Sequence, residues 1–126
     1  MKHLKKSALA ILASLALIGC GSDDGAIRHS SDPQEAADHL SDAFAGADAE
    51  ARKTAGIASD AIKKGQYQKA LYAIETIKKR PDVNFDQGVA VRDSLVNLEE
   101  ELIYRMRDGD PKAKQAYQLL KRINQN

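Results

Sequence analysis

The sequence predicts an all-α fold, with about four helices arranged as antiparallel hairpins over residues 32–126. Apolar residues recur at spacings of three and four, which places them on one face of a helix. Asp-Pro pairs precede two of these periodic stretches, where the aspartate can cap a helix and the proline suits its first position. We find no convincing strand pattern.

Residues 1–19 are predicted to form a signal peptide that is cleaved after export. Three lysines (Lys2, Lys5 and Lys6) precede residues 7–18, which are apolar apart from two serines. A helix of that length spans about 18 Å at about 1.5 Å per residue, whereas a bilayer core is about 30 Å thick. A basic segment followed by a short apolar one is typical of a secretory signal.

The apolar stretch ends in Leu17-Ile18-Gly19-Cys20, which resembles the lipobox of bacterial lipoproteins. The resemblance implies cleavage between Gly19 and Cys20 and a diacylglyceryl group on the Cys20 thiol. The alternatives are an ordinary signal peptide with a chance cysteine, or an uncleaved anchor. Each buried CH₂ contributes about 0.8 kcal/mol, so two or more acyl chains hold a protein on a membrane where one does not.

The expected location is the cell membrane or the outer membrane, with the domain facing the periplasm or the cell exterior. The family's sorting rule concerns the residue after the cysteine, here Gly21, which favours the outer membrane. Residues 20–31 are then the lipidated Cys20 and a flexible tether, because residues 21–31 are polar, rich in Gly and Ser and without period. Removal of the signal peptide leaves 16 basic and 18 acidic residues, a formal charge of −2.

The first helix is expected to begin after Asp32-Pro33 and to end at Gly65. Its apolar face is mostly Ala, so it can approach a neighbouring helix closely but buries little area per residue. Gly46 and Gly56 each weaken the helix by about 1 kcal/mol relative to Ala. A bend or break near Gly46 is therefore left open.

Three further helices are expected, over residues 67–79, over residues 85–108 and after Asp110-Pro111. Asn84 and Gln87 form the pattern of a capping box. The apolar stripe of each helix marks its predicted buried side. The stripes are Ala70, Leu71, Ile74 and Ile77 in the second helix, Val91, Leu95, Leu98, Leu102 and Met106, widened by Ile103, in the third, and Ala113, Ala116, Tyr117, Leu120 and Ile123 in the fourth.

One stretch resembles a tetratricopeptide repeat, through Gly65-Gln66-Tyr67-Gln68-Lys69-Ala70-Leu71, Ile74, Ile77 and Pro81. The resemblance covers roughly residues 51–81, a single repeat. It implies a tetratricopeptide-like helical hairpin, not a tandem array, because the second hairpin does not keep the family's period. Members of that family bind peptides in a groove lined by the first helix of each repeat. By position, the residues that would face such a groove are Arg52, Ala55, Ser59, Ile62 and Lys63.

The mature chain is also similar to a group of small predicted bacterial lipoproteins of unassigned activity. The shared features are an Ala-rich first helix, a Gly-x-Tyr turn, a Pro-Asp loop and a terminal Gly-Asp helix. This resemblance implies a fold and a cellular location, but no catalytic or binding activity.

The sequence offers no case for catalysis, a cofactor or a small-molecule substrate. It contains none of the nucleophile, zinc-protease or phosphate-loop motifs that carry such chemistry. His39 and Asp42 lie three residues apart, but no second His or Cys accompanies them at metal-ligand spacing, so no metal site is predicted. The near balance of 19 basic and 18 acidic residues argues against a nucleic-acid partner.

Charge is distributed unevenly along the chain. Residues 21–62 hold three basic and nine acidic residues, and residues 63–126 hold 13 basic and nine acidic ones. The simplest interpretation is that the two halves complement each other or are solvated. The alternative is a basic patch for lipid head groups or an acidic protein, made of Lys63, Lys64, Lys69, Lys78, Lys79 and Arg80.

Two functions follow from these observations. The first is a non-enzymatic, lipid-anchored envelope protein that acts as a protein-interaction or scaffold module, with membrane contact through acyl chains on Cys20 and an envelope protein as partner. The second is a self-associating structural spacer of the envelope. In that case the stripe of Leu95, Leu98, Leu102 and Met106 would pair between chains.

Overall fold

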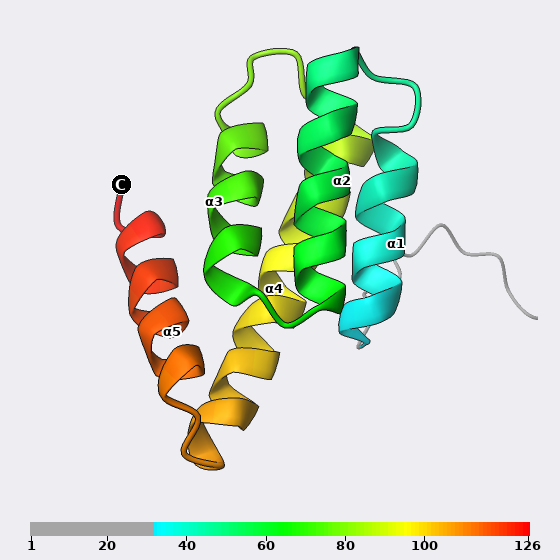
Figure 1. The fold of residues 1–126 in the computed structure, drawn as a ribbon. Helices are drawn as coiled ribbons and strands as arrows, with labels where there is room; N and C mark the ends of the chain where they lie inside the picture. Colours follow the sequence, from blue (N-terminus) through cyan, green and yellow to red (C-terminus); the bar gives the residue numbers. More distant parts are fainter. Residues whose placement is uncertain (1–31) are drawn as a thin grey trace, which may run out of the picture.

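The computed structural model describes residues 32–126, and all the regular structure within them is helical. Consecutive helices run in opposite directions (Figure 1). The five helices are α1 (Pro33–Ala43), α2 (Ala49–Lys63), α3 (Tyr67–Lys78), α4 (Phe85–Arg107) and α5 (Pro111–Ile123). The all-α prediction is confirmed. The predicted signal peptide, the Gly19–Cys20 cleavage site and the tether lie outside the described residues.

The described residues form five helices rather than about four, because the first expected helix divides at residues 44–48. The helix α1 ends at Ala43, and the backbone N–H of Ala47 donates to the carbonyl of Phe44 at 3.0 Å. The Asp48 carboxylate then accepts from the N–H of Ala51 at 2.8 Å and caps α2. The Phe44 side chain, 1% exposed, ties this turn to the core. The packing of Phe44 and the cap at Asp48 therefore interrupt the first helix expected from the sequence.

Three predicted helix starts are confirmed by capping hydrogen bonds, whereas α3 begins at Tyr67 without a side-chain cap. The Asp32 carboxylate accepts from the N–H of Gln34 at 2.9 Å. Asn84 and Gln87 make the reciprocal bonds of a capping box, at 2.9 and 3.1 Å. The Asp110 carboxylate accepts from the N–H groups of Lys112 and Ala113. These bonds satisfy N–H groups that have no partner within their own helix.

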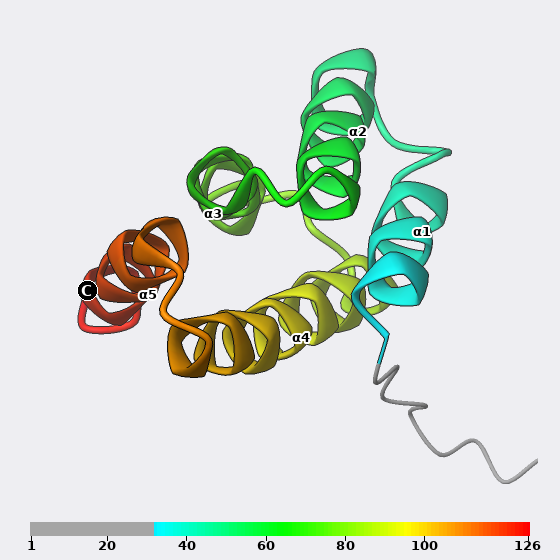
Figure 2. The same ribbon diagram turned by 60° about the horizontal axis from the view of Figure 1, so that its bottom comes forward.

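The longest helix, α4, lies along one side of the domain and packs against α1, α3 and α5 (Figure 2). On the other side, α2 packs against α1 and α3. The helix α5 completes the domain by packing on α3 and α4. Three helices therefore depend on α4 for part of their burial.

Half of the buried apolar residues in residues 32–126 are alanines, 11 of 22. Small side chains let helix axes approach closely, so the larger residues fill the spaces between the alanine contacts. The predicted stripe of α3 is fully buried, as are Leu98 and Leu102 of α4, whereas Leu95 and Met106 are half-buried against the core. The expectation that Ile103 widens the buried stripe of α4 is wrong, since this side chain is partly exposed and does not pack against the core cluster. The largest fully buried apolar side chains are Phe44, Leu40, Leu71, Ile74, Ile77, Leu98, Leu102 and Leu120.

The turn between α2 and α3 requires glycine at one position. Gly65 has a φ of +67°, in the left-handed region that favours glycine. A Cβ at this position would meet only ordinary contacts, with the Tyr67 ring atoms at 3.7 and 3.8 Å. The cost of a side chain here is therefore conformational rather than steric.

Replacing Gly65 by Ala should destabilise the domain by about 1 kcal/mol, because an L-residue in the left-handed region costs about 1–2 kcal/mol. The matched control is Gly56→Ala within α2, where a new Cβ meets nothing within 4 Å. That variant should gain about 0.5–1 kcal/mol from the higher helix propensity of Ala. Urea unfolding measures both changes, and equal shifts in the two variants would contradict this interpretation of the turn.

Candidate functional site

The five residues predicted to face a peptide groove all lie on α2, but they do not share an open surface. Ala55 is fully buried, and Ser59 and Ile62 are each 5% exposed. Arg52 and Lys63 are exposed. The Lys63 ammonium forms an ion pair with Asp38 of α1. A partner reaching this face would therefore meet two basic side chains above a packed interior.

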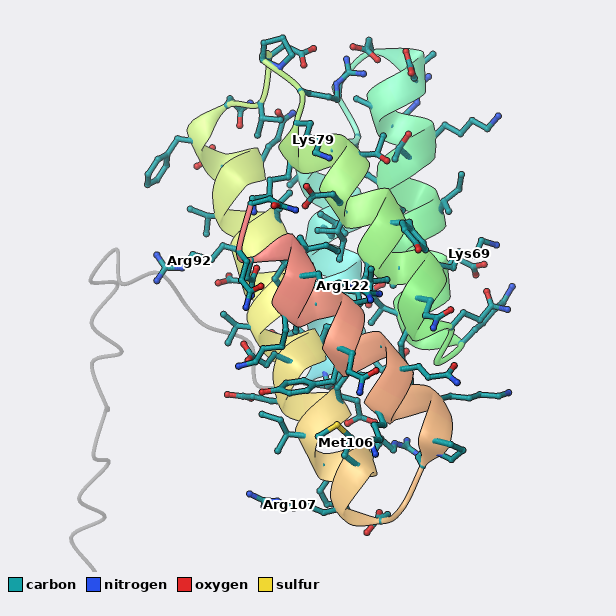
Figure 3. All side chains as sticks on the ribbon, turned by 90° about the vertical axis from the view of Figure 1, so that its left-hand side faces the viewer. Lys69, Lys79, Arg92, Met106, Arg107 and Arg122 are labelled. Carbon is teal, nitrogen blue, oxygen red and sulfur yellow. The ribbon has the colours of Figure 1, made fainter. Side chains whose placement is uncertain are left out.

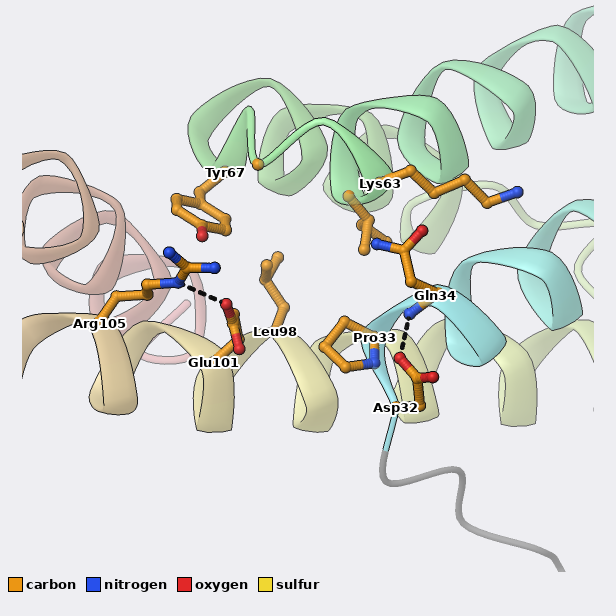
Figure 4. A pocket seen from close by; sticks show the side chains of 10 residues that line it. Asp32, Pro33, Gln34, Lys63, Tyr67, Leu98, Glu101 and Arg105 are labelled. Carbon is orange, nitrogen blue, oxygen red and sulfur yellow. Dashed lines mark hydrogen bonds and ion pairs between the residues drawn. The ribbon is translucent and has the colours of Figure 1, made fainter.

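Ile62 and Lys63 nevertheless help to line a small pocket at the end of the domain where the described chain begins (Figure 4). Its volume is about 230 Å³. The start of α1, the end of α2, the start of α3 and the second half of α4 surround it. The remaining lining residues are Asp32, Pro33, Gln34, Gly65, Tyr67, Leu98, Glu101 and Arg105.

Paired charges and a phenol dominate one wall of this pocket. The Arg105 guanidinium donates to the Glu101 carboxylate at 2.7 Å, and this bond raises the pKa of Arg105. Burial raises the pKa of the Tyr67 phenol, an effect that the Arg105 cation partly offsets. Figure 4 shows the Tyr67 hydroxyl pointing toward the guanidinium. The wall thus offers a phenol and an ion pair that is already satisfied internally.

A second feature is a shallow and wider groove between the outer sides of α2 and α3, with a volume of about 570 Å³. Two of the side chains that line it are large, apolar and exposed, Ile57 (37% exposed) and Tyr72 (60% exposed). Lys69 is its one charged lining residue among those the structure describes. The other lining residues are Thr54, Gln68, Ala73 and Thr76. The sequence did not single out Tyr72, whose only signal is an aromatic residue off the apolar stripe of its helix.

The predicted basic patch is largely neutralised within the chain. Besides the Lys63–Asp38 pair, two further ammonium groups form ion pairs. The Nζ atom of Lys64 lies 2.9 Å from Oδ2 of Asp60, and that of Lys79 lies 3.2 Å from Oε1 of Glu75. These contacts favour the simpler interpretation, that acidic and basic segments complement each other. Exposed pairs of this kind contribute about 0–1 kcal/mol each to stability.

Arg80 makes the most extensive of these contacts. Its guanidinium donates to Asp82 at 2.9 and 3.0 Å and also to Asp48, the residue that caps α2. A carboxylate oxygen of Glu50 lies 3.9 Å from Nη1 of Arg80. The bond from Arg80 lowers the pKa of the Asp82 carboxyl. One side chain thus joins the loop after α3 to the turn between α1 and α2.

His39 faces a carboxylate that sequence spacing does not indicate. Its Nδ1 lies 4.0 Å from Oδ2 of Asp93, a side chain of α4 that is 2% exposed. The neighbouring Ser94 hydroxyl donates to the carbonyl of Ala36 at 3.4 Å. Polar contacts therefore accompany the apolar packing between α1 and α4. No group of three or more metal-ligating side chains gathers anywhere in residues 32–126.

Replacing Arg80 by Gln should lower stability at neutral pH and flatten the loss of stability in acid. Because the folded pKa of Asp82 is lowered, its ionised form contributes stability above the unfolded pKa, and this contribution is lost as pH falls through the folded value. The wild-type unfolding midpoint should therefore drop below about pH 4 more steeply than that of the variant. Arg122→Gln, on the exposed face of α5, is the control. Parallel acid profiles of R80Q and the wild type would refute the expectation.

Helices long and apolar enough to cross a membrane do not occur within residues 32–126. Comparison of the sequence with protein-family models, with curated proteins and with solved structures gives no significant match.

Proposed function

We propose that this chain is a lipid-anchored protein of the bacterial cell envelope whose helical domain is a non-enzymatic interaction module. The observation that carries the proposal is Leu17-Ile18-Gly19-Cys20, placed directly after a basic and then apolar leader. The capped start of α1 at Asp32 marks the first residue of the helical domain. The chain has 11 residues between Cys20 and Asp32, and their composition suits a spacer between a membrane and a domain.

The interaction role draws support from the outer side of α2 and α3. The resemblance to a tetratricopeptide hairpin concerns these two helices, and their shared groove presents Ile57 and Tyr72. An aromatic side chain that keeps much of its surface exposed beside a shallow apolar groove is a typical anchor point for a protein partner. The pocket beside Tyr67 holds paired charges and is smaller than most ligand pockets, which favours a partner protein over a small-molecule substrate.

The anchor is tested by metabolic labelling with an alkyne-bearing fatty acid. The wild-type protein should carry the label, and Cys20→Ser should lose it, because Cys20 is the single cysteine of the chain. Ser22→Ala, two residues further on, should be labelled like the wild type. Label retained in Cys20→Ser would refute the anchor.

The interaction surface is tested by cross-linking in native membranes followed by mass spectrometry. Ile57→Ser with Tyr72→Ser should reduce the yield of the major cross-linked envelope protein by at least about tenfold, the effect of losing about 1.4 kcal/mol. Tyr104→Ser is the control, since Tyr104 is similarly exposed (61%) but lies on α4. Equal losses in both variants would contradict a surface on α2 and α3.

A further inference from the structure

The side of α4 that faces away from the core carries its own apolar row. Phe85 is 77% exposed and Val96 is 40% exposed. Val89 and Ile103 are partly exposed, and neither belongs to the side chains packed against the core cluster of the described residues. We call these four residues, with Arg92, Glu99, Glu100 and Arg107 beside them, the outer face of α4.

The spacing of this row supplies one of the two positions of a helix-pairing seam. Val89, Val96 and Ile103 are each seven residues apart, and all three are β-branched. The second position, three residues further on, holds Arg92 after Val89 and Glu99 after Val96, so the stripe combines apolar and charged side chains. The opposite stripe of α4 is already used, since Leu98 and Leu102 are 1% and 0% exposed. Self-association through the stripe expected from the sequence would require the core to open, whereas the outer face is available without any rearrangement.

The charges of the outer face are self-complementary in one direction only. Arg92 lies four residues before Val96, and Glu100 lies four residues after it. A second α4 running antiparallel and centred near Val96 therefore brings Arg92 beside Glu99 and Glu100 of the second copy. A parallel second copy would instead place Arg92 against Arg92 and glutamates against glutamates, which is destabilising.

The same rule holds at the two ends of the helix. Asp86, near the start of α4, would lie close to Arg107 of the second copy, and Phe85 would approach its Ile103. Figure 3 shows Arg92 and Arg107 both projecting from α4 on the side away from α3 and α5. Contacts that are exchanged in this reciprocal manner are those of a two-fold symmetric dimer.

We propose that the outer face of α4 binds the outer face of a second copy of this chain, antiparallel and around a two-fold axis near Val96. Glu99 and Glu100 disfavour an anionic membrane surface as the occupant. One helix of 23 residues is about 35 Å long and provides a small interface, so the dimer exchanges readily. The inference goes beyond the proposed function and does not depend on Cys20.

The test is thiol cross-linking of the full chain in its native membranes. Val96→Cys places a thiol beside the proposed axis, so a short bismaleimide should give a product of twice the chain mass. Lys114→Cys, on the exposed side of α5, and the parent chain are the controls and should stay largely uncross-linked. Absence of the double-mass product, an equal yield in Lys114→Cys, or a Val96→Cys product of another mass would each overturn the proposal.

Charge exchange tests the direction of pairing. Arg92→Glu in the Val96→Cys background should lower the cross-linking yield at least about tenfold. Adding Glu99→Arg and Glu100→Arg should restore it, while Arg122→Glu on α5 should leave it unchanged. Circular dichroism of each variant verifies that the helices remain. Failure of the compensating changes to restore the product would overturn the antiparallel arrangement. A double-mass product from the parent chain would reveal a free Cys20 thiol and hence failure of the anchor, whereas absence of the product from Val96→Cys alone reveals failure of the dimer.

Discussion

Close approach between alanine-rich helix faces is the constraint on which this domain depends. Alanine buries little surface, so each alanine contact contributes less than a leucine contact would. The stabilisation is concentrated instead in the larger residues between these contacts, such as Leu40, Ile74 and Leu98. The helix α4 supplies two of them, Leu98 and Leu102, and touches three other helices. A domain of this kind relies heavily on well-defined helix ends, and four of its five helices have a side-chain cap.

The helices themselves could be predicted from the sequence because their signals are local. The start at Asp32-Pro33, the Asn84–Gln87 box and the stop at Gly65 depend on neighbouring residues and on physical rules that act within one turn. The division at residues 44–48 could not be decided in the same way. A glycine within a helix costs only about 1 kcal/mol, and the packing of Phe44 in the folded domain decides the outcome.

The contacts between helices could not be predicted from the sequence in the same way, because they depend on how the helices pack. Nothing near His39 in the sequence indicates that Asp93 faces it, since 54 residues separate them. The basic residues between Lys63 and Arg80 suggested a surface patch, whereas the structure sets most of them against carboxylates. The predicted groove residues on α2 are a second example of a surface that the sequence suggested and the packing altered. Helical spacing identified one side of α2, but burial of Ser59 and Ile62 became evident only once α1 and α3 were in place.

The placement of α1 has a mechanical consequence for an anchored protein. On the proposed anchoring, a pull from the membrane enters the domain at Asp32, at the start of α1, whose flanks lie against α2 and α4. A pull along the axis of α1 would shear whole helix flanks past each other instead of peeling them apart one turn at a time. The short seam between Ala36 and Ser94 and between His39 and Asp93 would then share the load with the apolar contacts of Leu40.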